Sequence, residues 1–262
     1  VMTFAKLWGL YLNSAYYKEL KPRTQKDYLQ HQKKLLLTFG KMRADSIKPE
    51  HIRRFMDKRG LQSKTQANHE MASMSRAFRW GHERGYVKGN PCAGISKFKM
   101  IPRDYYAIDE EYVAVYEEAS DRLKVAMEIS YLCASRAGDI TKVKWSDELE
   151  LGLFIQQGKT GKKQIKAWSE RLKNALDLAR KVMPPTSSND YIIVNTLGGK
   201  LTTKTLNNWW LEARRKASEN LGRTLTFTFH DLKAKGISDY EGTSRDKQLF
   251  SGHKTESQVL IY

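Results

Sequence analysis

Five short segments of the chain carry polar side chains of the kinds that act on phosphate groups. In chain order they supply an arginine, a lysine, a histidine with a lysine three positions later, a second histidine and a tyrosine. These residues are Arg136, Lys159, His230, Lys233, His253 and Tyr262. Cations can hold a phosphate, a tyrosine hydroxyl can attack its phosphorus, and a proton donor can serve the leaving oxygen. The set predicts attack on a phosphodiester, with no need of a metal ion.

Each of these residues also has an ordinary structural interpretation when it is considered alone. Arg136 could be a charge at a helix end, paired locally with Asp139. Lys159 could be a solvated turn residue, either histidine could be structural, and the tyrosine could be a terminal aromatic. The occurrence of all five segments in this order favours the chemical interpretation over these alternatives.

The charge of the chain is strongly positive and unevenly distributed. The 262 residues include 46 Lys and Arg and 29 Asp and Glu, which gives a net charge of +17. Residues 1–100 hold 21 of the basic and 7 of the acidic residues, so that this part alone carries +14. Such a concentration of positive charge is typical of a surface that binds nucleic acid. A basic surface that serves only solubility is the alternative.

The two cysteines, Cys92 and Cys133, are too few for a disulfide framework, and no metal-ligating pattern surrounds them. We therefore expect free thiols in a reducing cytosol, with Cys133 buried. No apolar run in the sequence approaches the roughly 18 residues that a membrane span requires, and no signal peptide is recognisable. The composition thus argues against a membrane-embedded protein.

Residues 1–95 predict a helical domain, because apolar residues recur there at three- and four-residue spacing. The predicted helices begin at Thr3, near Thr24, at Pro49 and at Ser63 or Lys64. Threonine and serine can cap a helix N-terminus, and proline is favoured in its first turn. Residues 96–106 contain basic residues and few apolar anchors, which is typical of a linker.

Residues 107–262 predict a second domain that mixes helices with a small sheet. Apolar residues alternate over 151–155 and again over 165–167, on either side of a turn-like segment at 158–163. This pattern predicts a hairpin with Lys159 near its tip. The other expected elements are a helix that begins at Asp109, helices over 125–134, 169–182 and 205–220, and a short strand over 191–194.

Taken together, the motifs resemble those of the tyrosine recombinases, specifically the phage-type integrases, over nearly the whole chain. The resemblance rests on Ser135-Arg136-Ala137-Gly138-Asp139, Lys159-Thr160-Gly161-Lys162, His230 to Lys233, Ser251-Gly252-His253 and Tyr262. It implies a mostly helical fold with a small β-sheet, in which a helical core-binding domain precedes a mixed α+β catalytic domain. It also implies site-specific cleavage and rejoining of DNA through a 3′-phosphotyrosine intermediate, with neither a metal nor another cofactor.

The resemblance implies a role for each residue of the set. Tyr262 would be the nucleophile, and Lys159 would protonate the leaving 5′-oxygen. The residues that would contact the phosphate are Arg136, His230, Lys233 and His253. The last of these could instead orient the nucleophile, and Asp139 would hold the cations in place. The basic face of residues 1–100 would bind DNA.

The same resemblance implies partners and a location. The partners would be double-stranded DNA attachment sites, three further copies of the chain in a homo-tetramer on synapsed DNA, and the DNA-bending accessory proteins that family members often use. The location would be the bacterial cytoplasm, in association with the nucleoid.

The chain departs from the family pattern at Lys233, where the family has a second arginine. Lysine keeps the positive charge but lacks the planar fork that grips two phosphate oxygens at once. Family members also usually continue beyond the tyrosine with a segment that docks on a neighbouring subunit, and a separate amino-terminal domain for arm-type DNA sites is not recognisable here. We therefore expect the chain to be a fragment of a longer protein.

Two other functions remain open on the sequence alone. An enzyme like the type IB topoisomerases would use the same groups to nick and reseal one duplex, although the short helical front domain is more typical of an integrase. A basic DNA-binding module with a weakened catalytic domain is the other alternative, and Lys233 is the residue that keeps it open.

Overall fold

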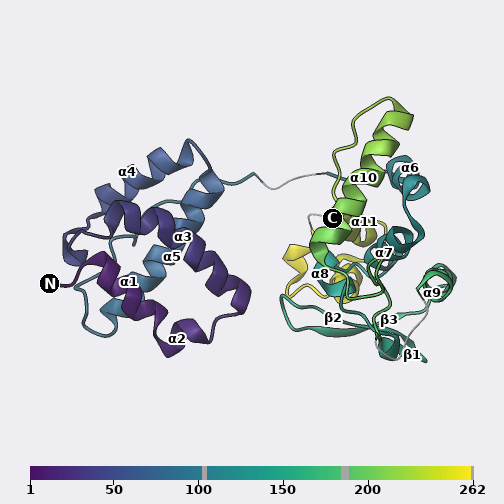
Figure 1. Cartoon of the computed structure of the whole chain (residues 1–262), viewed down its shortest axis with the longest axis horizontal. Coiled ribbons are helices and arrows are strands. Elements are labelled where there is room, and N and C mark those ends of the chain that lie inside the picture. The colour runs from purple at the N-terminus through teal and green to yellow at the C-terminus, as the bar shows by residue number, and fades with distance from the viewer. Residues whose placement is uncertain (102–104, 184–188, 261–262) are drawn as a thin grey trace. The chain divides into compact units, whose positions relative to one another are not determined.

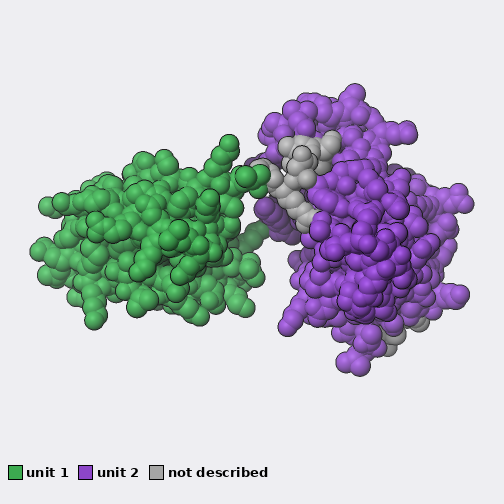
Figure 2. Space-filling view, turned by 90° about the horizontal axis from the view of Figure 1, so that it is seen from above, with its two compact units in different colours: residues 1–103 green, residues 104–262 purple. Residues whose placement is uncertain are grey.

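The computed structural model describes residues 1–101, 105–183 and 189–260. The chain divides into two compact units, residues 1–103 and residues 104–262 (Figures 1 and 2). The prediction of a mostly helical protein with a small β-sheet is confirmed. Tyr262, which the sequence predicts as the nucleophile, lies outside the described residues.

The first unit is built from helices. These are α1 (Phe4–Leu12), α2 (Ala15–Lys18), α3 (Pro22–Phe39), α4 (Pro49–Gly60) and α5 (Lys64–His82), with a 3-10 turn at Ala44–Ser46. The four predicted helices are confirmed, and the short α2 is an addition to them. Helix α5 packs against α1, α3 and α4. Aromatic rings fill the space between these helices, and Phe4 of α1 stacks on Phe78 of α5 with ring centroids 5.6 Å apart.

Local sequence explains where these helices begin. The side chain of Thr3 accepts a hydrogen bond from the backbone N–H of Lys6, and Ser63 accepts one from the N–H of Gln66. Each bond satisfies one of the N–H groups that a helix N-terminus leaves unpaired. Helix α4 begins at Pro49, whose missing N–H costs nothing in the first turn.

Residues 96–106, the predicted linker, are attached at both ends. Phe98 exchanges two backbone-to-side-chain hydrogen bonds with Asn68 of α5, at 2.8 and 2.9 Å. At the other end, the hydroxyl of Tyr106 donates to Asp239 in the second unit at 2.5 Å. Phe98 and Tyr106 therefore each contact the unit to which they belong.

The second unit contains seven helices in the described ranges, with one small sheet. They are α6 (Asp109–Glu118), α7 (Asp121–Leu132), α8 (Ala137–Ile140), α9 (Glu170–Val182), α10 (Thr203–Leu221), α11 (Asp231–Ser238) and α12 (Ser244–Ser251), with 3-10 turns at Trp145–Asp147 and Glu256–Gln258. Helix α7 is the central element and packs against α8, α9, α10 and α11. The predicted helices are confirmed, although α7 begins four residues before the expected Val125.

The sheet is the predicted hairpin with one further short strand. Strand β1 (Glu148–Leu149) pairs with β2 (Gly152–Gln156), which pairs with β3 (Lys163–Ala167), and all pairs are antiparallel. Gln156 lies opposite Lys163, so residues 157–162 form the connection and carry Lys159. The predicted hairpin is therefore confirmed.

The strand predicted over 191–194 is wrong. Tyr191 makes an isolated bridge with Lys144, and Val194 makes another with Lys200, but no ladder connects them. The intervening Ile192 and Ile193 are almost fully buried in the core of the second unit. The apolar run is therefore a buried segment without strand pairing. Apolar periodicity alone does not distinguish such a segment from a buried strand.

Both cysteines are buried free thiols, which confirms the prediction for Cys133. Burial raises the pKa of Cys92 and that of Cys133 to about 12, because the thiolate would lack solvation. Over the described part of the chain, no helix combines the length and the apolar character needed to cross a bilayer.

Candidate active site

Arg136 lies at the start of α8, directly after a tight turn that follows α7. Ala134 in this turn has a φ of 48°, a left-handed conformation that costs a non-glycine residue about 1 kcal/mol. The hydroxyl of Ser130 donates to the carbonyl of Ser135 at 2.8 Å and holds the turn closed. The turn thus fixes the backbone of Arg136 at the start of α8, next to the end of the buried helix α7.

Asp139 connects Arg136 to the hairpin. Its Oδ1 accepts a hydrogen bond from the backbone N–H of Gly158 at 2.8 Å, and its Oδ2 lies 4.0 Å from Nη1 of Arg136. Among the described residues, this Nη1 and this Oδ2 are buried without a hydrogen-bond partner. A buried polar group without a partner costs about 1–3 kcal/mol. Nη1 of Arg136 is therefore available to an oxygen of a ligand.

Lys159 occupies the turn of the hairpin and is exposed. The turn is closed by backbone bonds, since Gln157 N–H donates to the Lys162 carbonyl and Gly161 N–H donates to the Gln157 carbonyl. Gly161 has a φ of +75°, which suits glycine. The hydroxyl of Thr160 donates to Oε1 of Gln157 at 2.9 Å. The backbone around Lys159 is therefore ordered even though its side chain faces solvent.

His230 and Lys233 lie at the first turn of α11. Asp231 fixes this turn, because its Oδ2 accepts from both the N–H and the hydroxyl of Thr228, at 2.6 and 3.0 Å. His230 is exposed, whereas the Lys233 side chain is buried and only 3% exposed. The Lys233 backbone N–H donates to the His230 carbonyl, but its ammonium makes no hydrogen bond or ion pair to another described residue. Its ammonium is thus a second buried cationic group that lacks a fixed partner within the described ranges.

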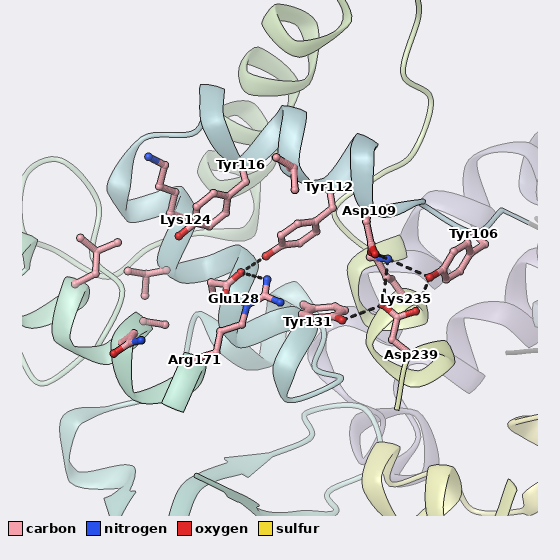
Figure 3. A pocket seen from close by; sticks show the side chains of 15 residues that line it. Tyr106, Asp109, Tyr112, Tyr116, Lys124, Glu128, Tyr131, Arg171, Lys235 and Asp239 are labelled. Atoms are coloured by element: carbon pink, nitrogen blue, oxygen red, sulfur yellow. Dashed lines mark hydrogen bonds and ion pairs between the residues drawn. The ribbon is translucent and has the colours of Figure 1, made fainter. Parts of the chain in front are cut away.

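A separate polar cluster holds α11 against α6 and α7 (Figure 3). The buried ammonium of Lys235 pairs with Asp109 at 2.6 Å and with Asp239 at 3.0 Å, and it donates to the hydroxyl of Tyr106. A Cβ on Gly236 would lie 2.0 Å from the Tyr131 carbonyl, so α11 approaches α7 too closely for any other residue. Lys235 also lines a cavity of about 830 Å³, which Lys233 does not line.

His253 follows the C-terminal end of α12. Gly252, with a φ of +73°, ends the helix in the left-handed conformation. Nδ1 of His253 forms a hydrogen bond of 2.6 Å with the hydroxyl of Ser251, which is fully buried. The imidazole ring is therefore held by the residue two positions before it.

The pKa values show that these groups share one electrostatic environment. Burial and the nearby charge of Arg136 lower the pKa of Lys233 to about 8, although Asp139 raises it. Burial, followed by the charges of Lys233 and Arg136, lowers the pKa of His253 to about 4. Although His230 is exposed to solvent, partial desolvation and the charges of Arg136 and Lys233 lower its pKa as well. Both histidines are therefore neutral near pH 7.

The structure thus brings five predicted residues to one place, namely Arg136, Lys159, His230, Lys233 and His253. The charge of Lys159 acts on both His230 and Lys233, which places the hairpin turn within electrostatic reach of α11. Asp139, predicted to hold the cations, contacts both Arg136 and the hairpin. The site combines fixed positive charge with neutral imidazoles, which suits the binding of an anion and the transfer of protons around it.

The expected apolar side chains of β3 do not face the core. Ile165 is 50% exposed, whereas the neighbouring Lys166 is 5% exposed. Lys166 lies opposite Leu153 and Gln164 lies opposite Ile155, so these two polar residues share the buried face of the hairpin. Burial lowers the pKa of Lys166 to about 8. The sequence pattern did not identify Lys166, because a lysine between apolar residues is typical of a solvent-facing position.

Known proteins resemble this chain in sequence and in fold. Residues 108–262 match the model of the Phage integrase family. The chain is 27% identical over 208 residues to the integrase of Escherichia phage lambda, and the match covers 73% of this chain and 56% of that protein. The chain spans about half the length of the curated relatives it matches.

Two solved structures of lambda integrase share the fold at 22% sequence identity. A dimer bound to a COC′ core site aligns over 98% of this chain and 97% of that chain, with a TM-score of 0.86. A tetramer bound to a Holliday junction aligns over 98% of this chain and 79% of that chain, with a TM-score of 0.85. The family model covers more than half of the residues, including every segment that carries the site. The chain belongs to the phage integrase family.

Proposed function

We propose that this chain is the DNA-cleaving part of a site-specific tyrosine recombinase, which cuts and rejoins DNA through a 3′-phosphotyrosine intermediate. The observation that carries the proposal is the environment shared by Arg136, Lys233 and His253. Two cationic groups, the Lys233 ammonium and the buried Nη1 of Arg136, lack a hydrogen-bond partner among the described residues and lie beside neutral imidazoles. A phosphodiester would supply the oxygens that these groups lack.

The proposed reaction exchanges one phosphodiester bond for another. The hydroxyl oxygen of Tyr262 attacks phosphorus, the bond from phosphorus to the 5′-oxygen breaks, and Lys159 gives a proton to that leaving oxygen. The phenol proton of the tyrosine passes to an acceptor, for which a neutral imidazole such as His230 or His253 is suited. The 5′-hydroxyl of a partner strand reverses the step, which joins the exchanged strands.

The cationic groups stabilise the charge that develops on the non-bridging oxygens. Arg136 donates N–H groups from a fixed position, and Lys233 acts as a point charge. With a pKa of about 8, Lys233 is mostly protonated at pH 7. A bound phosphate raises the pKa of Lys233 further, because an opposite charge favours the ammonium form. Lysine at this position is therefore compatible with the reaction.

The first unit, in this proposal, supplies much of the DNA affinity as a core-binding domain. It is a compact helical body, and residues 1–100 carry a net charge of +14. The solved lambda integrase dimer bound to a core site supports this proposal by its similarity in fold to nearly the whole chain. Phosphate contacts from such a basic unit hold the duplex without reading its sequence.

The partners are double-stranded attachment sites and further copies of the chain. A tetramer on synapsed DNA is the proposed assembly, which the lambda integrase tetramer on a Holliday junction supports. DNA-bending accessory proteins would assist the synapse. We place the protein with the nucleoid in the bacterial cytoplasm, where its two buried thiols stay reduced.

The proposal is tested with nicked suicide substrates, whose cleaved end diffuses away and traps the covalent intermediate. A panel of candidate attachment sites would be incubated with the protein and resolved under denaturing conditions. A protein–DNA adduct at one site or a few sites is the expected result. Nicking and resealing of unrelated duplexes would indicate a topoisomerase-like enzyme instead, and binding without any adduct would indicate a DNA-binding module.

A further inference from the structure

Three side chains of the hairpin donate hydrogen bonds to the last carbonyl groups of α12. Nε2 of Gln164 donates to the Leu249 carbonyl at 2.7 Å. Nζ of Lys166 donates to the Phe250 carbonyl, and Nε2 of Gln157 donates to the Ser251 carbonyl at 2.9 Å. We call Gln157, Gln164 and Lys166 the hairpin clamp.

The clamp completes the hydrogen bonding of a helix end. The last four carbonyls of an α-helix have no partner within the helix. In α12, the first of them, that of Gln248, accepts the N–H of Gly252 at 2.9 Å, and the clamp satisfies the remaining three. The ammonium of Lys166 also complements the negative end of the helix dipole. This arrangement accounts for a buried lysine that has no acidic partner among the described residues.

Gly252 permits the close approach of the hairpin to the helix. A Cβ at this position would lie 2.5 Å from Oε1 of Gln164 and 2.6 Å from Nε2 of Gln157. Real Cβ atoms do not come so close to polar atoms, so any other residue would displace the clamp. The glycine that precedes His253 is therefore required by the hairpin as well as by its own left-handed backbone.

A continuous chain of hydrogen bonds runs from the hairpin turn to His253. The Thr160 hydroxyl donates to Oε1 of Gln157, at the residue next to Lys159. The Gln157 amide donates to the Ser251 carbonyl, and the Ser251 hydroxyl bonds Nδ1 of His253 at 2.6 Å. Gln157 is 5% exposed and Ser251 is fully buried. The middle of the chain therefore lies inside the protein, where hydrogen bonds are strong and their loss is costly.

We infer that Gln157, Gln164 and Lys166 are positioning residues, which lock the hairpin turn that carries Lys159 to the end of α12 that carries His253. This inference rests on the proposed function. Lys159 is exposed and must reach one leaving oxygen, so its position depends on the backbone that bears it. Asp139 holds one point of the turn through Gly158, and the clamp holds the first residue of the turn, Gln157, and the strand β3 that follows it.

The test replaces one donor of the clamp without changing its size. Gln157→Glu puts a carboxylate against the Ser251 carbonyl and removes the N–H donor. Gln156→Glu is the matched control, because Gln156 is exposed, ends strand β2 directly before Gln157 and receives the same charge change. Both variants would be assayed for DNA affinity and for single-turnover cleavage of a suicide substrate.

A second substrate distinguishes misplacement of Lys159 from a general disturbance of the fold. In it, sulfur replaces the 5′-bridging oxygen, and a thiolate leaves without a proton because thiols are far more acidic than alcohols. We expect Gln157→Glu to cleave the oxygen substrate about tenfold to a hundredfold more slowly than Gln156→Glu, at similar affinity. On the sulfur substrate most of this difference should disappear, as it should for Lys159→Ala.

Two results would overturn the inference. Equal cleavage by Gln157→Glu and Gln156→Glu would mean that the clamp positions nothing, and an equal loss on both substrates would mean that it acts on the fold rather than on Lys159. If Gln157→Glu does not fold, Lys166→Met, which removes the buried ammonium but keeps an unbranched side chain only one atom shorter, is judged by the same comparison. Absence of an adduct with the unaltered protein would instead contradict the proposed function itself.

Discussion

Oδ1 of Asp139 accepts a hydrogen bond from the backbone N–H of Gly158 at 2.8 Å, across 19 residues of sequence. The bond joins α8 to the hairpin turn. Arg136 lies at the N-terminus of α8, and Lys159 directly follows Gly158 in the turn. The same carboxylate raises the pKa of Lys233 against the effect of burial. The Asp139 side chain thus lies near Arg136, holds the turn that carries Lys159 and favours the charged form of Lys233.

Asp139→Asn should therefore impair cleavage in a pH-dependent manner. The amide oxygen can still accept from Gly158, but the negative charge that favours the ammonium form of Lys233 is lost. The pKa of Lys233 should fall further below about 8, so that less of it is charged at neutral pH. The measurement is the single-turnover cleavage rate from pH 6 to 9. A profile parallel to that of the unaltered protein would show that the charge of Asp139 is irrelevant.

Two substitutions of Lys233 should change the cleavage rate differently. Lys233→Ala should lower the cleavage rate by about 10², because a phosphate oxygen loses its cation in a buried site. Lys233→Arg should keep the rate or raise it at neutral pH, since arginine adds a second N–H if its shape fits.

The pH dependence separates these two side chains. Cleavage by the unaltered protein at subsaturating DNA should decline as the pH rises through about 8, because the ammonium of Lys233 loses its proton. Lys233→Arg should not show this decline, since the guanidinium stays charged. Should Lys233→Ala cleave as fast as the unaltered protein, the segment His230 to Lys233 has been assigned wrongly to the site.

Arg136→Ala removes a second cation of the site, the half-buried Arg136. The loss of one donor that stabilises transition-state charge costs about 2.7–4 kcal/mol, or about 10² to 10³ in rate. Ground-state affinity for DNA should change much less, because the remaining basic surface is intact. The check is single-turnover cleavage at saturating protein. A rate within about twofold of the unaltered protein would reduce Arg136 to a helix-end charge that pairs with Asp139.

DNA affinity should depend steeply on salt and on the first unit. Neutralised phosphates release counterions, so the logarithm of the affinity should fall linearly with the logarithm of the salt concentration. A protein consisting of residues 101–262, which keeps a net charge of only +3, should bind far more weakly and with a smaller slope. Electrophoretic or fluorescence titrations at several salt concentrations measure both. Equal affinities for the two proteins would contradict a DNA-binding role for residues 1–100.

The sequence predicted the parts of the fold that local rules determine. Helices with long apolar stripes and a capping residue, such as those after Thr3 and Ser63, begin where their caps indicate. The turn that carries Lys159 is also a local feature, since Gly158 and Gly161 surround it. Residue types in a fixed order were sufficient to single out five residues that the structure brings within electrostatic reach of one another.

The remaining features depend on tertiary packing. Helices α8, α11 and α12 span only four or eight residues each, too few for a periodic signal. The burial of Lys166 requires α12, which lies about 80 residues away in sequence and presents a carbonyl to it. The buried run at 191–194 has the composition of a strand but lacks a partner to form a ladder. Such features become visible only when distant segments are placed together.

The nucleophile is the central claim, and Tyr262→Phe tests it most directly. The substitution removes the one oxygen proposed to attack phosphorus and leaves every cation of the site unchanged. On a nicked suicide substrate, the unaltered protein should form a covalent adduct, which protease digestion reduces to a phosphotyrosine peptide. The phenylalanine variant should bind the same DNA within a few-fold and form no adduct. An adduct with the variant, or a peptide linked through any other residue, would contradict the account.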